Sequence, residues 1–149
     1  MVDTGWASGI ERRLKAIESE SGIRIILQFH AKSPTPQEDA VAGAYMKSIA
    51  TSLGIAQKGV LIVYFADDPD WRIWVGDDLA SRFAGKSGSV AELTASGAIH
   101  EVKEAYLTSS VAKADADFRS SPGPSSVSRR LGLEANALLE NLCLKLGIK

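Results

Sequence analysis

The chain has 149 residues with 17 basic and 18 acidic side chains, which gives a formal net charge of −1 at pH 7. A chain of this length fits one domain, which can bury about 70% of the surface that its unfolded form exposes. The balanced charge disfavours a nucleic-acid-binding protein, because such proteins carry a basic excess. The basic residues near Arg12 and Arg129 are not interleaved with aromatic residues, so we expect no nucleic-acid partner.

The sequence gives little indication of a transmembrane segment, a signal peptide or a disulfide bond. No apolar run approaches the ~20 residues that cross a bilayer, so we expect no transmembrane segment in this chain. Residues 1–4 lack the basic-then-apolar pattern of a signal peptide, so we expect any leader to be absent from this chain. Cys143 has no partner for an intrachain disulfide, and its apolar helical surroundings predict a small core residue. We expect a monomer.

The first third of the chain predicts a helix, a strand and a second helix. Apolar residues at helical spacing indicate a first helix that is capped by Ser8 and ends at Gly22. Residues 23–30 form the first predicted strand. The second helix is predicted from about Pro36 to Gly54.

The next segment is typical of a β-hairpin. The run Val60–Phe65 is continuously apolar, as expected of a strand that is covered on both faces. The run Trp71–Val75 is rich in aromatic and β-branched residues, and Trp71 and Trp74 are expected on opposite faces of its strand. Between the two runs lies an acidic turn in which Pro69 removes a backbone donor and stops the first strand.

Chain topology brings several polar residues to one edge of the predicted sheet. A right-handed strand–helix–strand crossover makes the first two strands parallel and places their carboxyl ends together. His30 therefore shares an edge with the three aspartates of the turn, which are Asp67, Asp68 and Asp70. At ~3.3 Å per residue, Asp77 and Asp78 lie nearly 20 Å away at the opposite edge, so the five aspartates cannot form one site.

The acidic turn is the strongest candidate site. Three carboxylates on a tight turn repel one another unless a cation lies among them, and oxygen ligands suit Ca²⁺ or Mg²⁺. We therefore predict a divalent-cation site at Asp67, Asp68 and Asp70, with His30 as a contributor from the same edge. The alternative is that these residues only form a turn, which Asp and Pro favour for backbone reasons. The sequence shows no motif for another cofactor, since it has neither zinc-ligand spacing nor a phosphate-binding glycine loop. It also has no serine nucleophile elbow.

The second half of the chain is predicted to be helical. We expect a short helix over 78–83, a loop over 85–89, a long helix over 90–107 and a further turn of helix over 112–118. The chain beyond residue 126 carries a strong apolar stripe, and residues from about 128 to 145 form either a docked or a partner-binding helix, of which we favour the docked one. The stripe consists of Leu131, Ala135, Leu138, Leu139, Leu142 and Leu146.

These elements divide the chain into three parts. Residues 1–119 are expected to form the α/β domain, residues 120–126 a linker rich in Pro, Gly and Ser, and residues 127–149 a C-terminal amphipathic helix docked on the same domain.

Four segments of the chain resemble the landmarks of the TPM domain family, in the family's order: Ser21–Ile26, Leu53–Gly59, Gly59–Val63 and Ala66–Gly76. The match covers about residues 8–118. It departs from the family at Val75–Leu79, where members usually read Val-Gly-Tyr-Gly-Leu, and it lacks the Gly-Asp-Tyr near the domain end. The resemblance implies a three-layer α/β/α sandwich around a small mixed sheet, made of a parallel crossover unit and a β-hairpin, to which this chain adds its C-terminal helix.

The resemblance also implies a function. TPM-type domains are extracytoplasmic, in the periplasm, outside the cell or in a lumen, although a cytoplasmic setting stays open here. The implied role is that of a divalent-cation-binding accessory or interaction domain in a membrane-associated protein assembly. The alternative is a weak metal-assisted acid phosphatase, a phosphomonoesterase in which Asp68 or Asp70 activates water or attacks the substrate. A third hypothesis makes the C-terminal helix the partner-binding element and the aspartates a simple turn.

Overall fold

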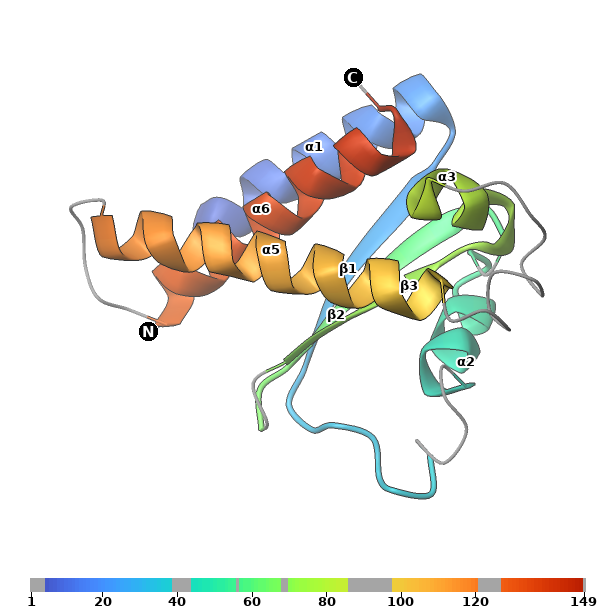
Figure 1. The fold of residues 1–149 in the computed structure, drawn as a ribbon, viewed down its shortest axis with the longest axis horizontal. Coiled ribbons are helices and arrows are strands. Elements are labelled where there is room, and N and C mark those ends of the chain that lie inside the picture. The colour runs from blue at the N-terminus through green and yellow to red at the C-terminus, as the bar shows by residue number, and fades with distance from the viewer. Residues whose placement is uncertain are drawn as a thin grey trace.

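A computed structural model describes residues 5–38, 44–55, 57–67, 70–85, 98–120 and 127–148. These residues form five α-helices, one 3-10 turn and a three-stranded sheet (Figure 1). In chain order the elements are α1 (Gly5–Ser21), β1 (Arg24–His30), α2 (Ala44–Ser52), β2 (Gly59–Phe65), β3 (Asp70–Val75), η1 (Asp77–Leu79), α3 (Ala80–Ala84), α5 (Ala98–Ser120) and α6 (Val127–Leu146). The predicted α/β class is thus confirmed.

The sheet has the order β1-β2-β3 and is mixed. Strands β1 and β2 are parallel, in a register that pairs Ile25 with Val60 and His30 with Phe65. Strands β2 and β3 are antiparallel and pair Phe65 with Asp70 across the turn. The parallel crossover and the β-hairpin are therefore both present as the sequence predicts.

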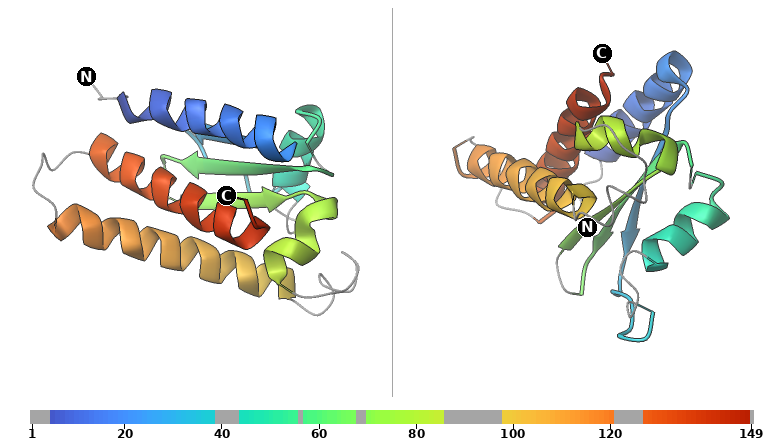
Figure 2. Two further views of the ribbon diagram at one scale, coloured as in Figure 1. Left: turned by 90° about the horizontal axis from the view of Figure 1, so that it is seen from above. Right: turned by 45° about the vertical axis from the view of Figure 1, so that its right-hand side comes forward.

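Helices α1, α3, α5 and α6 cover one face of the sheet, and α2 lies on the other (Figure 2). Trp71 contributes to the core on the first face and Trp74 to the core beneath α2, as their spacing predicts. The second face carries Leu61, Val63 and Phe65, which pack against α2. A complete three-layer sandwich is not confirmed, because in the described part of the chain this face is covered by one helix of nine residues, α2, together with Leu53 and Ile55 that follow it.

Helix α6 packs into the larger core through its apolar stripe. Leu138 and Leu142 are fully buried, and Cys143 is buried among the same residues, as predicted. The phenol of Tyr106 in α5 donates a hydrogen bond of 2.5 Å to the carbonyl oxygen of Leu138. Arg82 of α3 donates to the carbonyl oxygen of Leu146 at 2.8 Å, so α6 is fixed at its centre and at its C-terminal end. None of the described helices is long and apolar enough to cross a bilayer.

Several predicted helix boundaries differ from the observed ones. Helix α1 begins at Gly5, so Ser8 lies inside it and is not its cap. Near the predicted start of α2, Thr35 and Glu38 exchange the two hydrogen bonds of a capping box, at 3.0 and 3.2 Å. The helix itself is described only from Ala44, and residues 39–43 lie outside the described residues.

Helix α5 is continuous through the region where the sequence predicts two separate pieces. The run of Thr and Ser after Leu107 contains no Gly or Pro, so nothing in it forces the helix to end. Tyr106, Ser110 and Ala114 are buried at a spacing of four residues, which continues one buried face through the predicted break. The side-chain amide of Asn141 donates to the hydroxyl of Ser110 at 3.0 Å and satisfies this buried polar group. Of the linker predicted over 120–126, Ser120 belongs to α5 and residues 121–126 lie outside the described residues. Residues 86–89 of the predicted loop and residues 90–97 of the predicted long helix also lie outside them.

Two glycines meet where β2 begins and β3 ends. The Gly76 N–H donates to the carbonyl oxygen of Gly59 at 2.8 Å. A Cβ atom on Gly76 would lie 2.6 Å from the carbonyl carbon of Gln57 and 2.9 Å from the oxygen of Gly59. Both neighbours are backbone atoms, so only glycine fits at this position.

Candidate functional site at the carboxyl edge of the sheet

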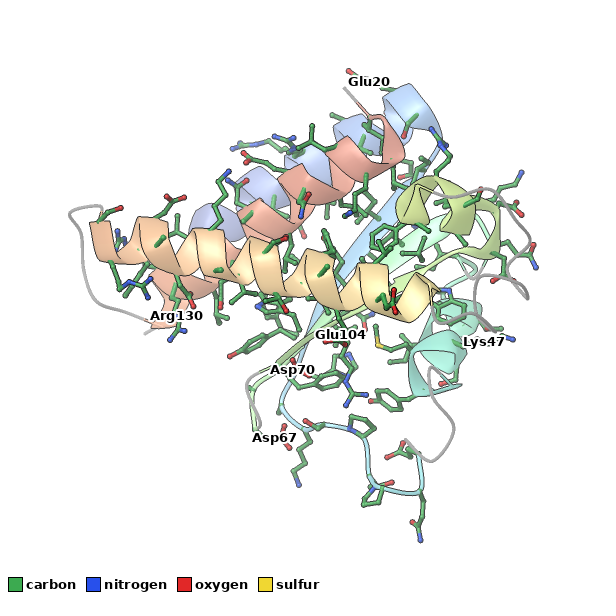
Figure 3. The ribbon with its side chains drawn as sticks, viewed as in Figure 1. Glu20, Lys47, Asp67, Asp70, Glu104 and Arg130 are labelled. Atoms are coloured by element: carbon green, nitrogen blue, oxygen red, sulfur yellow. The ribbon has the colours of Figure 1, made fainter. Side chains whose placement is uncertain are left out.

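The strand register brings two predicted site residues, His30 and Asp70, into one row with Phe65. His30, Phe65 and Asp70 are paired across the three strands, so their side chains point to the same face. Figure 3 shows Asp67 and Asp70 at this end of the sheet, where the turn between β2 and β3 lies beside the loop that follows β1. Asp68 lies outside the described residues.

Asp67 joins two loops that are far apart in the sequence. Its carboxylate accepts the backbone N–H of Ser33 at 2.9 Å to Oδ1 and 3.0 Å to Oδ2. The Ser33 hydroxyl donates a further bond to Oδ1 at 2.7 Å. The loop after β1 is thereby held against the β2–β3 turn, which gives Asp67 a structural role whether or not a ligand binds.

Asp70 lies closest to a basic partner on its own strand. Its Oδ2 is 3.8 Å from Nε of Arg72, and the two side chains are 60% and 31% exposed. An ion pair this long and this exposed contributes at most about 1 kcal/mol. The Arg72 guanidinium also lies over the Phe65 ring, 5.4 Å from its centroid.

His30 is oriented by two neighbours. Its Nε2 lies 2.9 Å from Oε1 of Gln28, a contact in which a protonated ring nitrogen donates to the amide oxygen. The imidazole packs edge-on against Phe65 at 5.6 Å between ring centroids. Within the described residues, no three or more His, Cys, Asp or Glu side chains gather closely enough to share one metal ion.

The other two aspartates of the region lie at the opposite edge of the sheet. Asp77 and Asp78 follow β3, beside the start of β2. The Asp78 N–H donates to the carbonyl oxygen of Gln57 at 2.9 Å. The separation of these residues from the acidic turn agrees with the prediction that the five aspartates do not form one site.

A second charged cluster, which the sequence did not indicate, lies where α5 and α6 pack together beside the sheet. It consists of Asp115 on α5 and of Arg130 and Glu134 on α6. Arg130 binds Asp115 with two parallel hydrogen bonds, from Nε and from Nη2, each 3.2 Å long. The same Nε lies 4.0 Å from Glu134, and Glu134 is only 6% exposed. A carboxyl group this buried, with no closer basic partner among the described residues, is uncommon in a small domain.

Burial is the largest influence on the Glu134 carboxyl. Desolvation, followed by the charge of Asp115, raises the pKa of Glu134, whereas the Trp71 indole and Arg130 lower it, and the net direction is upward. Among the described groups, the buried indole N–H of Trp71 has no partner in full hydrogen-bond geometry, so its influence on Glu134 is that of a loose contact. Burial also raises the pKa of Tyr64, and Glu134 adds to that effect.

Comparisons with known protein families, with curated proteins and with solved structures found no match to this chain. The resemblance to the TPM domain therefore rests on the sequence motifs and on their order.

Proposed function

We propose that the chain is an accessory or interaction domain of TPM type that binds a divalent cation, Ca²⁺ or Mg²⁺, at the carboxyl edge of its sheet. The ligands in this proposal are Asp67, Asp68 and Asp70. The observation that carries it is the contact between Asp67 and Ser33, which holds the loop after β1 against the acidic turn. The proposal includes the family's three-layer architecture and its extracytoplasmic, membrane-associated setting.

The donor atoms at this edge fit a weak site for a hard cation. The Asp67 carboxylate accepts the Ser33 N–H with both oxygens and the Ser33 hydroxyl with Oδ1, so it is held in one orientation at this edge. The Asp70 side chain is 60% exposed, so its carboxylate lies at the surface where a cation and its water ligands can approach. Ca²⁺ takes six to eight oxygen ligands, and water and backbone carbonyls would supply the others. Such an incomplete protein shell favours dissociation constants of about 10⁻⁴–10⁻³ M.

Backbone amide NMR titrations with Ca²⁺ and with Mg²⁺ test this site. We expect saturable shifts at the amides of Ser33, Asp67 and Asp70, and a loss of affinity of about tenfold in Asp67→Asn, since removing one ligand charge weakens a carboxylate site. Asn keeps an oxygen that can accept the Ser33 bonds, so the loop contact is largely preserved. Asp78→Asn, at the opposite edge, is the matched control and should bind as the wild type does.

Two results would refute the cation site. One is the absence of saturable shifts at millimolar Ca²⁺ and Mg²⁺. The other is an equal loss of affinity in Asp67→Asn and Asp78→Asn, which would indicate nonspecific attraction by an acidic surface.

The second candidate function is a weak metal-assisted phosphomonoesterase. It is favoured by the position of Arg72, whose guanidinium lies beside Asp70 on the same face as His30. A guanidinium matches the geometry of a phosphate group, and a bound cation would stabilise charge on the phosphoryl oxygens. In this function Arg72 orients the ester and Asp70 or Asp68 acts on water or on phosphorus.

Hydrolysis of p-nitrophenyl phosphate at saturating Mg²⁺ distinguishes the two functions. If the domain is a phosphatase, Asp68→Asn or Asp70→Asn should lower kcat by about 10²-fold or more, the usual contribution of a catalytic acid or base. Asp78→Asn should retain full activity. If both variants at the acidic turn hydrolyse the ester at the wild-type rate, the activity comes from a contaminant.

A further inference from the structure

The Glu134 carboxyl group is buried where the α5–α6 helical pair meets the sheet. Its basic neighbour, Arg130, also binds Asp115. Arg130 makes two hydrogen bonds of 3.2 Å to Asp115 but lies 4.0 Å from Glu134. The Asp115 side chain is 21% exposed, whereas that of Glu134 is 7% exposed. The better-solvated carboxylate thus has the better ion pair, and Glu134 is left with the poorer one. Figure 3 shows Arg130 near the C-terminal end of α5, where α5 and α6 extend past the strands.

We propose that Glu134 makes the docking of α6 on the sheet pH-sensitive, so that α6 is held tightly when the carboxyl group is protonated and is loosened when it ionises. This pH dependence of α6 docking needs no ligand and does not involve the acidic turn. It acts at the point where α6 meets the aromatic side chains of the hairpin, Trp71 on β3 and Tyr64 on β2.

The groups that act on Glu134 come from each element packed around it. Asp115 on α5 opposes its ionisation, and Arg130 on α6 favours it. Trp71 on β3 favours the carboxylate through its indole N–H, and the phenol of Tyr64 on β2 stays neutral because burial and Glu134 raise its pKa. The two favourable contacts are a 4.0 Å ion pair and a donor without full hydrogen-bond geometry, and they do not offset the loss of water around the charge.

The direction of the effect follows from linkage. The pKa of Glu134 is raised above its ordinary value of 4.5. A carboxyl group with a higher pKa in the folded state contributes stability that is fully present below the unfolded-state pKa and is lost as the pH rises through the folded-state pKa. Docking of α6 should therefore weaken from about pH 4.5 upward. Each unit of pKa elevation corresponds to a tenfold change in the opening equilibrium.

Amide hydrogen exchange, corrected for the intrinsic rate at each pH, measures this opening in the full chain. In the wild type, the opening constant of α6 amides should rise between pH 4 and pH 7, by about tenfold per unit of elevation, while that of central β2 amides changes less. In Glu134→Gln the amide is neutral at all pH values and keeps an oxygen that can accept from Trp71. Its α6 amides should be as protected at pH 7 as those of the wild type at pH 4.

Glu140→Gln is the matched control. Glu140 is also on α6 and also faces a basic residue of α5, Lys113 at 3.8 Å, but its side chain is 45% exposed. This variant should retain the wild-type pH dependence. The proposal is overturned if Glu134→Gln exposes α6 at pH 7, if both variants flatten the profile equally, or if α6 and β2 amides lose protection together. A direct carboxyl ¹³C titration of wild-type Glu134 with a midpoint at or below the ordinary value would overturn it as well, without any variant.

Discussion

Replacing Gly76 with alanine is expected to lower the free energy of unfolding by about 3 kcal/mol, the upper end of the usual cost of overpacking. The backbone at Gly76 has φ −57°, which any residue can adopt, so conformational strain contributes nothing. The cost is purely steric, because the new Cβ would lie 2.6 Å from the carbonyl carbon of Gln57 and 2.9 Å from the oxygen of Gly59. Both carbonyl groups accept backbone hydrogen bonds, from Asp78 and from Gly76, so they cannot move aside as a flexible side chain can.

Gly9→Ala is the control for this substitution. Gly9 lies inside α1, and a Cβ there would meet only the Arg12 guanidinium at 4.0 Å. Alanine should therefore stabilise the protein by about 0.5–1 kcal/mol through helix propensity. Urea-induced unfolding followed by circular dichroism measures both values. Equal effects of the two substitutions would show that the close approach at Gly76 is not the cause.

The second large effect is expected at the centre of α6. Leu138→Ala should cost about 2–5 kcal/mol, because Leu138 is fully buried and its truncation leaves a cavity that the surrounding helices and sheet cannot fill. The loss should appear as a lower midpoint in the same urea unfolding experiment. This substitution also separates a docked α6 from one that is reserved for a partner.

Leu144→Ala makes the same chemical change on the other side of the helix. Leu144 is 80% exposed, so its truncation should change stability by no more than about 0.5 kcal/mol. If Leu138→Ala were equally mild, α6 would not be packed on the domain in solution, and the partner-binding alternative would gain support.

The elements that the sequence predicts best are those whose patterns are local. The continuous apolar run of β2 and the alternating aromatic residues of β3 define a hairpin whose register needs no information from elsewhere. The parallel pairing of β1 with β2 follows from the long helical connection between them, since parallel neighbours need such a crossover. The glycines in the motifs that resemble the TPM domain also have a steric explanation, since Gly59 and Gly76 meet at the hairpin base.

The features that the sequence did not predict, the continuity of α5 and the burial of Glu134, depend on tertiary contacts. Helix α5 was predicted as two pieces separated near Ser110, but packing of Tyr106 and Ala114 on the same face keeps the helix intact. Burial of Glu134 was also missed, although a signal is present. Glu134 lies four residues before Leu138 and next to Ala135, and so falls within the apolar stripe.

The candidate site was predictable in its location and not in its contacts. Strand topology places His30 and the acidic turn at one edge, as the register now shows. The contact between Asp67 and Ser33 joins residues 34 positions apart, and loops of this kind carry no periodic pattern from which such a pair can be read. Asp67, which the sequence suggests as a cation ligand, thus also accepts hydrogen bonds from Ser33 in the loop after β1.

The connection between β1 and β2 is attached to the rest of the molecule at both of its ends. At the carboxyl edge Ser33 is bound to Asp67, and at the amino edge the carbonyl oxygen of Gln57 accepts the N–H of Asp78. With both ends fixed, the entropic cost of a longer connection grows only slowly, by about 0.6 kcal/mol for each doubling of its length. A longer connection can therefore leave the two edges of the sheet with the same geometry, provided that it keeps α2, which covers Leu61, Val63 and Phe65.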